Sequence, residues 1–149
     1  MTGKFGFYAA IVLATMGAAA SGARADGLDL IAVRQAGFAL QGGDFAFIKS
    51  IVTAKGDVKP LEVPARAIAK WAAVIPTLFP KGTETGGETK ALPEIWSDPA
   101  GFQKKATAAA EAAVKLADAA KADDAEAVAA DLKTLGEQCG GCHKAFRAK

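Results

Sequence analysis

VAADLKTLGEQCGGCHKAF, residues 128–146, places apolar residues and both cysteines of the chain at alternating spacings of three and four. The series runs Val128, Leu132, Leu135, Cys139, Cys142 and Phe146. Residues at this period share one face of a helix. The stretch therefore predicts an amphipathic helix that carries its two thiols on the inward face.

Three further helices are expected nearer the N-terminus, each with an apolar seam of the same period. Their expected bounds are residues 28–54, 60–79 and 99–121. The apolar spacing of the first helix continues across Gly42-Gly43 without a shift. One continuous helix is therefore expected, with a weak point at these two glycines. In chain order the seams are Ile31, Arg34, Phe38, Gln41, Phe45, Ile48 and Val52; Leu61, Ile68, Trp71, Ile75 and Leu78; and Phe102, Ala109, Ala113 and Leu116.

The segments between these helices carry start and stop signals. Residues 80–98 are rich in Gly and Pro and are expected to form one long connection. Asp98 is expected to cap the third helix with Pro99 at its first position, and Asp123 with Glu126 predicts a capping box for the fourth. The predicted fold class is all-α, an antiparallel up-down-up-down four-helix bundle.

Residues 1–25 are expected to be a cleaved secretory signal. Lys4 supplies the positive start, residues 5–20 form an apolar run, and Ala23-Arg24-Ala25 provides a cleavage site between small residues. A retained membrane anchor is the alternative, but the run falls short of the roughly 20 apolar residues that span a bilayer. Residues 26–149 then form one domain in the periplasm.

The charge balance bears on the class of partner. The chain has 18 Lys and Arg against 16 Asp and Glu, and the expected signal removes Lys4 and Arg24, so the mature chain has 16 of each sign. A neutral chain without a Lys/Arg cluster gives no support for binding nucleic acid or an anionic membrane. Neither partner is expected.

Cys139-Gly140-Gly141-Cys142-His143 has the spacing at which a c-type haem is attached. The two thiols reach the vinyl groups on one porphyrin edge, and the following imidazole ligates the iron. One haem c per chain is therefore expected, bound within the bundle, with His143 as axial ligand. A thioredoxin-like pair would lie in a βαβ pattern, and a structural zinc would need a fourth ligand. A plain disulfide is the remaining alternative.

The other side of the iron lacks an obvious ligand in the mature chain. His143 is the single histidine, and Met1, Met16 and the single tyrosine, Tyr8, all lie in the expected signal. Ligation by two histidines, or by histidine with methionine, is thereby excluded within one chain. Unless a Lys or Asn is recruited, a five-coordinate, high-spin iron is expected.

Two residues of the first seam are candidates for the haem pocket. Arg34 is a cation among apolar residues, and a buried charge needs a counter-charge, which a haem propionate would supply. The alternative is an arginine that snorkels at the bundle edge. Phe38 lies one turn further along the same face, where periodicity alone favours a core aromatic.

Arg34-Gln35-x-x-Phe38, Pro93-Glu94-Ile95-Trp96 and Cys139-x-x-Cys142-His143-x-x-Phe146-Arg147 together resemble cytochrome c′ over residues 28–149. The resemblance implies that Arg34 and Gln35 contact the cofactor, that His143 is the proximal ligand with Arg147 beside it, and that Phe38 caps the vacant distal site. It also implies a homodimer built on the first two helices. Low-spin relatives ligate iron through a methionine of the first helix, which this chain lacks.

The expected function is binding of small gases, above all nitric oxide and also carbon monoxide. An apolar cap without a hydrogen-bond donor disfavours dioxygen and leaves neutral diatomics able to bind. The resemblance implies that nitric oxide can displace His143 and bind near Arg147. The alternative is a periplasmic electron carrier with an unknown redox partner. No enzyme activity is expected, because no distal His or carboxylate is placed near Phe38 to move protons.

Overall fold

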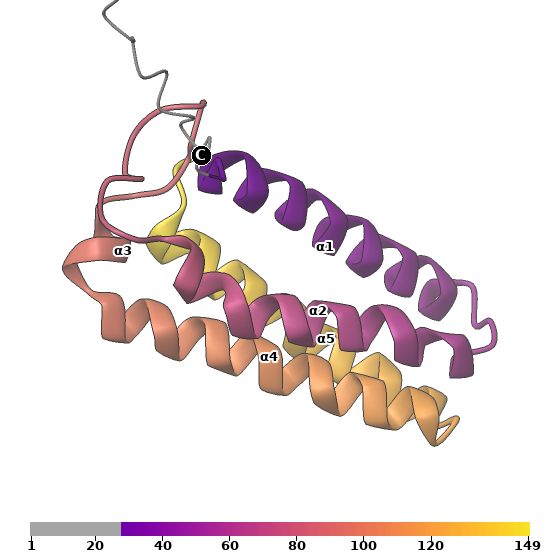
Figure 1. Ribbon diagram of the computed structural model, residues 1–149. Helices are drawn as coiled ribbons and strands as arrows, with labels where there is room; N and C mark the ends of the chain where they lie inside the picture. Colours follow the sequence, from indigo (N-terminus) through magenta and orange to yellow (C-terminus); the bar gives the residue numbers. More distant parts are fainter. Residues whose placement is uncertain (1–27) are drawn as a thin grey trace, which may run out of the picture.

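The computed structural model describes residues 28–149, which form four long helices and one short helix. The long helices alternate in direction along the bundle (Figure 1), which confirms the all-α, up-down-up-down prediction. The expected signal of residues 1–25 lies outside the described residues. The helices are α1 (Leu30–Thr53), α2 (Glu62–Val74), α3 (Glu94–Ser97), α4 (Pro99–Lys121) and α5 (Ala125–Phe146), and the 3-10 turns η1 (Lys59–Leu61) and η2 (Ile75–Leu78) flank α2.

The helix α1 begins at a capped end and runs without a break. The Asp29 carboxylate accepts hydrogen bonds from the backbone N–H groups of Ile31 and Ala32, at 2.9 and 3.1 Å. The helix continues through Gly42 and Gly43, as predicted. Within residues 28–149, no helix has both the length and the apolar character needed to cross a membrane.

The caps of α4 and α5 test two sequence predictions. The Asp98 carboxylate caps α4 as expected, accepting from the Gly101 N–H at 2.9 Å. The capping box expected at Asp123 is wrong by one residue, because Asp123 adopts a left-handed φ of 60° that turns the chain between the two helices. Asp124 carries the cap instead and accepts from the Ala127 N–H at 3.0 Å.

The long connection between α2 and α4 is more regular than predicted. Residues 94–97 form the one-turn helix α3 where only loop was expected. Ala91 pairs with Arg147 in an isolated bridge, and the Ala148 N–H donates to the Lys90 carbonyl at 2.8 Å. The connection and the C-terminal tail therefore brace each other at the end of α5.

Two groups of buried side chains fill the bundle. The first, which we call the closed half, lies toward the α1–α2 and α4–α5 turns and contains Ile48, Leu61, Ile68, Leu116, Val128 and Leu135, all fully buried. The second, the open half, lies toward α3 and the C-terminus and contains Ala72, Ile75, Ile95, Phe102, Ala109 and Phe146. The seams predicted for the second, third and fourth helices thus face the interior.

Candidate haem site

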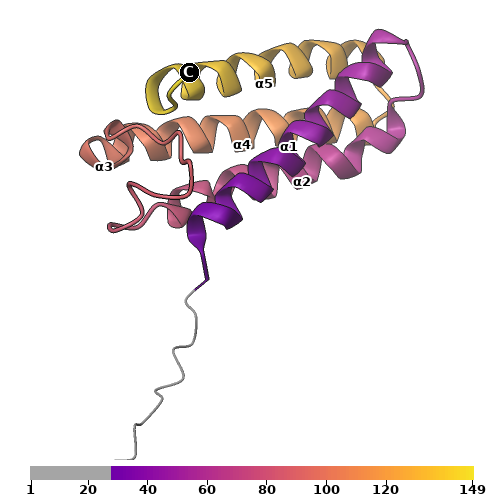
Figure 2. The same cartoon turned by 90° about the horizontal axis from the view of Figure 1, so that it is seen from above.

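A cavity of about 770 Å³ lies in the open half, between α1 and α5. Its floor is a contact between the two helices, where the Phe45 ring lies 3.4 Å from the position that a Cβ would occupy on Gly136. From this contact α1 diverges from α5 toward the C-terminal end of α5 (Figure 2). The cavity fills the wedge between them, and its volume is in the range of small-molecule and cofactor sites, about 300–1,000 Å³.

Every site residue predicted from the sequence lines this cavity. Helix α1 contributes Arg34, Gln35 and Phe38. Helix α5 contributes Cys139, Cys142 and His143, and Arg147 follows at its end. The fold thus brings together two sets of residues from opposite ends of the described chain.

The two thiols lie on one unbroken helix. Because α5 continues through Gly140 and Gly141, Cys139 and Cys142 are one turn apart on the same face, and both are half-buried free thiols. Burial raises the pKa of both thiols. For Cys142 the neighbouring Cys139 adds to this rise, whereas the positive charge of Lys105 lowers the pKa.

The imidazole of His143 faces the same cavity. Burial lowers its pKa, and the positive charge of Arg147 lowers it further. Both causes favour the neutral ring, which is the form that can donate a lone pair to a metal. The α5 wall therefore presents two thiols and one imidazole along little more than one helical turn.

The α5 wall also has room for a planar group. A Cβ added to Gly140 would meet no atom within 4 Å, apart from its own chain neighbours and helix backbone, so the surface over this glycine is open. Two thiols, one imidazole and an open glycine surface fit a c-type haem. Lys105 reaches this wall from α4, its Nζ lying 3.5 Å from the position that a Cβ would occupy on Gly141.

Arg34 is buried, with 2% of its surface exposed, so the snorkelling alternative is wrong. Its guanidinium donates to the Leu78 carbonyl at 3.1 Å, to Thr83 Oγ1 at 2.8 Å and to the Thr83 carbonyl at 3.0 Å. It also stacks on the Phe79 ring, 4.2 Å from the ring centroid. Arg34 therefore fastens the long connection to α1.

The charge of Arg34 has no carboxylate partner within the described residues. The ion pairs there are those of Arg66 with Glu62 and Asp118. Burial lowers the pKa of Arg34, and the negative charge of Asp29, which forms no ion pair with it, offsets only part of this shift. An acidic group entering the cavity, such as a haem propionate, would supply a close anion.

Phe38 is not a core aromatic, because 36% of its surface is exposed and the ring lines the cavity. It packs edge-on against Trp71 of α2, with ring centroids 6.0 Å apart. Trp71 lies across Gly37, whose missing side chain makes room for the indole. Within the described part of the chain the buried Trp71 Nε1 has no hydrogen-bond partner, and the ring packs against Phe38 and Gly37.

The sequence prediction missed five polar side chains of the cavity: Gln41, Glu88, Thr89, Lys90 and Lys105. Gln41 lines it from α1, which corrects the expectation that the distal side has no hydrogen-bond donor. The signal was available, because Gln41 is a polar residue on an apolar seam. Lys105 also lines it, and no local pattern in α4 marks that residue.

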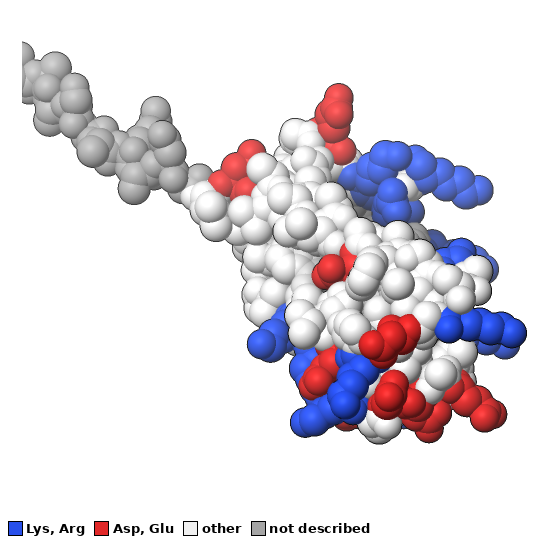
Figure 3. All heavy atoms as spheres, turned by 90° about the vertical axis from the view of Figure 1, so that its right-hand side faces the viewer, with Lys and Arg blue, Asp and Glu red and all other residues white. Residues whose placement is uncertain are grey.

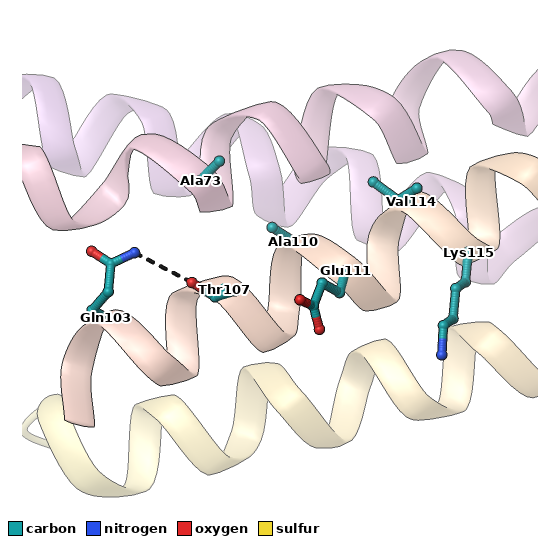
Figure 4. Close-up of a pocket in the computed structure, with 7 residues that line it drawn as sticks. All are labelled: Ala73, Gln103, Thr107, Ala110, Glu111, Val114 and Lys115. Atoms are coloured by element: carbon teal, nitrogen blue, oxygen red, sulfur yellow. Dashed lines mark hydrogen bonds between the residues drawn. The ribbon is translucent and has the colours of Figure 1, made fainter. Parts of the chain in front are cut away.

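A second hollow, of about 450 Å³, lies between α2 and α4 (Figure 4). Its lining comprises Ala73, Gln103, Thr107, Ala110, Glu111, Val114 and Lys115, and the Gln103 amide donates to Thr107 Oγ1 at 3.3 Å. These side chains include neither a thiol nor an imidazole. The haem ligands predicted from the sequence therefore all belong to the wedge between α1 and α5.

Known proteins are similar to this chain in sequence and in fold. The family model described as Cytochrome C' matches residues 29–147. The cytochrome c′ of Rhodospirillum rubrum is 39% identical over 84 residues, which cover 56% of this chain and 57% of that protein. The cytochrome c′ of Alcaligenes xylosoxydans xylosoxydans is 32% identical over 123 residues, which cover 81% and 94%. A solved nitric oxide complex of a mutant cytochrome c prime from Alcaligenes xylosoxidans is 32% identical with a TM-score of 0.73, covering 81% and 94%.

Proposed function

The chain belongs to the cytochrome c′ family and carries haem c on Cys139 and Cys142, and from that premise we propose that it is a periplasmic binder of nitric oxide. In this proposal His143 holds the iron from the α5 wall, and the opposite side stays free of protein ligands. A haem held by His143 alone would have a five-coordinate, high-spin iron. When bound, the haem supplies the open metal position at which a diatomic gas can bind.

The composition of the cavity lining is the observation that supports this proposal. His143 is the only imidazole of the chain, and the α1 wall opposite carries Phe38 where a second ligand would be needed. The cavity also contains Lys90 and Lys105, but a lysine ammonium has three donors and no lone pair to give a metal. The lining also includes the carboxylate of Glu88, from the connection between α2 and α4, but it contains no second imidazole and no methionine. It therefore favours one protein ligand over two.

Phe38 controls access to the open side in this proposal. The ring packs against Trp71 and lines the cavity. A gas molecule that binds on the α1 side of the site therefore has to push the ring aside. Neutral diatomics are small enough to bind despite this steric cost, and an apolar ring carries no charge that would select against them. The nitric oxide complex of the related protein supports the choice of ligand.

The test is the carbon monoxide affinity of Phe38→Ala. Removing the ring should raise the affinity of the ferrous protein about tenfold, which corresponds to relief of roughly 1.4 kcal/mol of steric strain. Val114→Ala is the matched control, because this apolar residue has a similar exposure but lies outside the cavity on α4. An unchanged affinity in Phe38→Ala would show that the ring does not cap the site.

We also propose that the protein is a homodimer that pairs through α1 and α2. Large apolar side chains are exposed on both helices: Leu40 at 73%, Phe47 at 49%, Val63 at 76% and Val74 at 44%. The surface over α1, next to the grey segment in Figure 3, carries few charged side chains. Sedimentation of the haem-loaded protein should give a dimer, and a monomer at all accessible concentrations would contradict the pairing.

A further inference from the structure

Gln41 is a polar side chain set between two phenylalanines. Phe38, Gln41 and Phe45 follow one another at spacings of three and four along α1, and all three line the cavity. The side chain of Gln41 therefore belongs to the same wall as the ring that covers the open side of the site. It is half-buried, as expected for a residue inside the wedge.

Antiparallel register places Gln41 opposite the open surface of α5. Phe45 meets Gly136 at the floor of the wedge. Because α1 and α5 run in opposite directions with the same rise per residue, residues before Phe45 and residues after Gly136 lie toward the same end of the bundle. Gln41 and Gly140 therefore both lie about one helical turn beyond the contact, on the side where the wedge opens, and a Cβ on Gly140 would find empty space.

The other polar groups on the α1 wall already have partners. The Gln35 amide donates to the Gly87 carbonyl at 2.7 Å, and Arg34 donates to Leu78 and Thr83. Gln41 makes no hydrogen bond within residues 28–149, and neither of its amide atoms is enclosed by protein. Its N–H donors thus remain available to whatever occupies the cavity.

We propose that Gln41 is a specificity-determining residue, whose side-chain amide donates a hydrogen bond to a gas molecule held on the α1 side of the site. The inference rests on the function proposed above and names the residue that discriminates between ligands there. A hydrogen bond formed among apolar rings is stronger than one in water. Ligands that gain negative charge when bound are retained, and less polar ones gain little.

The size of the effect follows from one hydrogen bond. A single neutral hydrogen bond changes an equilibrium or a dissociation rate about three- to tenfold. Removing the donor should therefore accelerate the dissociation of nitric oxide from the α1 side by that factor, whereas nitric oxide bound near Arg147 should be unaffected. It should change carbon monoxide affinity by less, because bound carbon monoxide carries less negative charge.

The experiment compares the haem-loaded wild-type protein with Gln41→Leu, using carbon monoxide as the vibrational probe. A donor near the ligand oxygen lowers the C–O stretching frequency and makes it sensitive to D₂O. We expect a higher, D₂O-insensitive frequency in Gln41→Leu and an intermediate value in Gln41→Asn, whose amide is one methylene shorter. Gln103→Leu makes the same chemical change outside the cavity and should keep the wild-type frequency.

The outcomes separate this inference from the proposed function. Equal frequencies and equal dissociation rates in wild-type protein and Gln41→Leu would overturn the role of Gln41 and leave gas binding intact. A wild-type protein that binds neither gas would overturn the proposed function and the inference together. Gln41→Asn keeps the amide and moves it by one methylene, so this variant tests the role of Gln41 even if a Gln41→Leu chain fails to fold.

Discussion

The closed and open halves of the bundle use the same four helices in different ways. In the closed half, α4 presents Ala112, Ala113, Ala117 and Ala120 as fully or nearly fully buried residues, and large aliphatic side chains from its neighbours fill the space around them. In the open half α4 presents Ala106 and Ala109 in the same way, yet a cavity remains. The divergence of α1 from α5 beyond Phe45 and Gly136 makes the difference.

The two halves of the bundle therefore have different roles. The closed half buries aliphatic side chains from all four long helices and so supplies stability. The open half instead contains an edge-to-face series of rings, Phe79, Phe102 and Phe146, on one side of an unfilled wedge. The cavity of the open half is not filled by protein side chains, and thiols, an imidazole and an arginine line it.

The largest expected effect is confined to the open half. Replacing both thiols, Cys139→Ser with Cys142→Ser, removes the two groups that bond to the haem edge, so covalent haem should be lost completely. Haem staining of the denatured polypeptide on a gel measures this directly. Haem that stays with the double variant through denaturation would contradict the assignment of the α5 wall.

The next effect belongs to the closed half. Leu116 is fully buried among the helices, so Leu116→Ala should lower the free energy of unfolding by about 2–5 kcal/mol, measured by denaturant titration. Covalent haem should be retained, because Leu116 does not line the cavity. Val114→Ala, on an exposed part of the same helix, should change stability by no more than about 0.5 kcal/mol. Equal losses in both variants would remove the distinction between the halves.

The smallest effect concerns the packing of Trp71 in the open half, where two opposing contributions determine whether the variant is more or less stable. Gly37→Ala gains about 1 kcal/mol of helix propensity but drives a methyl group into the Trp71 ring, which costs about 1–3 kcal/mol. The net result should be a loss of up to about 2 kcal/mol, with altered carbon monoxide affinity because Phe38 rests on Trp71.

Gly43→Ala is the control for that variant. A Cβ there meets nothing within 4 Å, so the propensity gain should appear alone, as a stabilisation of about 0.5–1 kcal/mol in the same titration. Stabilisation of similar size in both glycine variants would mean that Trp71 does not depend on the gap at Gly37.

The sequence was sufficient for those parts of the site that depend on local pattern. The spacing of Cys139, Cys142 and His143 needs only one helix, and the seam of residues 28–54 placed Arg34 and Phe38 on the face that lines the cavity. The cap of α5 was missed by one residue, because two adjacent aspartates compete for it and only the left-handed turn at Asp123 decides between them.

The features of the site that could not be predicted from the sequence depend on contacts between residues far apart in the chain. The partners of Arg34 lie 44 to 55 positions further along the chain, in a connection whose path has no periodic signal. The wedge itself depends on the angle between α1 and α5, which Phe45 and Gly136 set at one point of contact. For the same reason Gln41 could be placed in the first seam from the sequence but could not be assigned a role, although it lines the cavity.

The most direct test of the account is the resonance Raman spectrum of the haem-loaded protein at neutral pH, in the ferric and ferrous states. Its marker bands report the number of iron ligands and the spin state together. A single protein ligand, His143, predicts a five-coordinate, high-spin iron in the ferrous protein. A six-coordinate, low-spin spectrum, with protein side chains bonded to the iron on both sides, would contradict the account and favour an electron carrier.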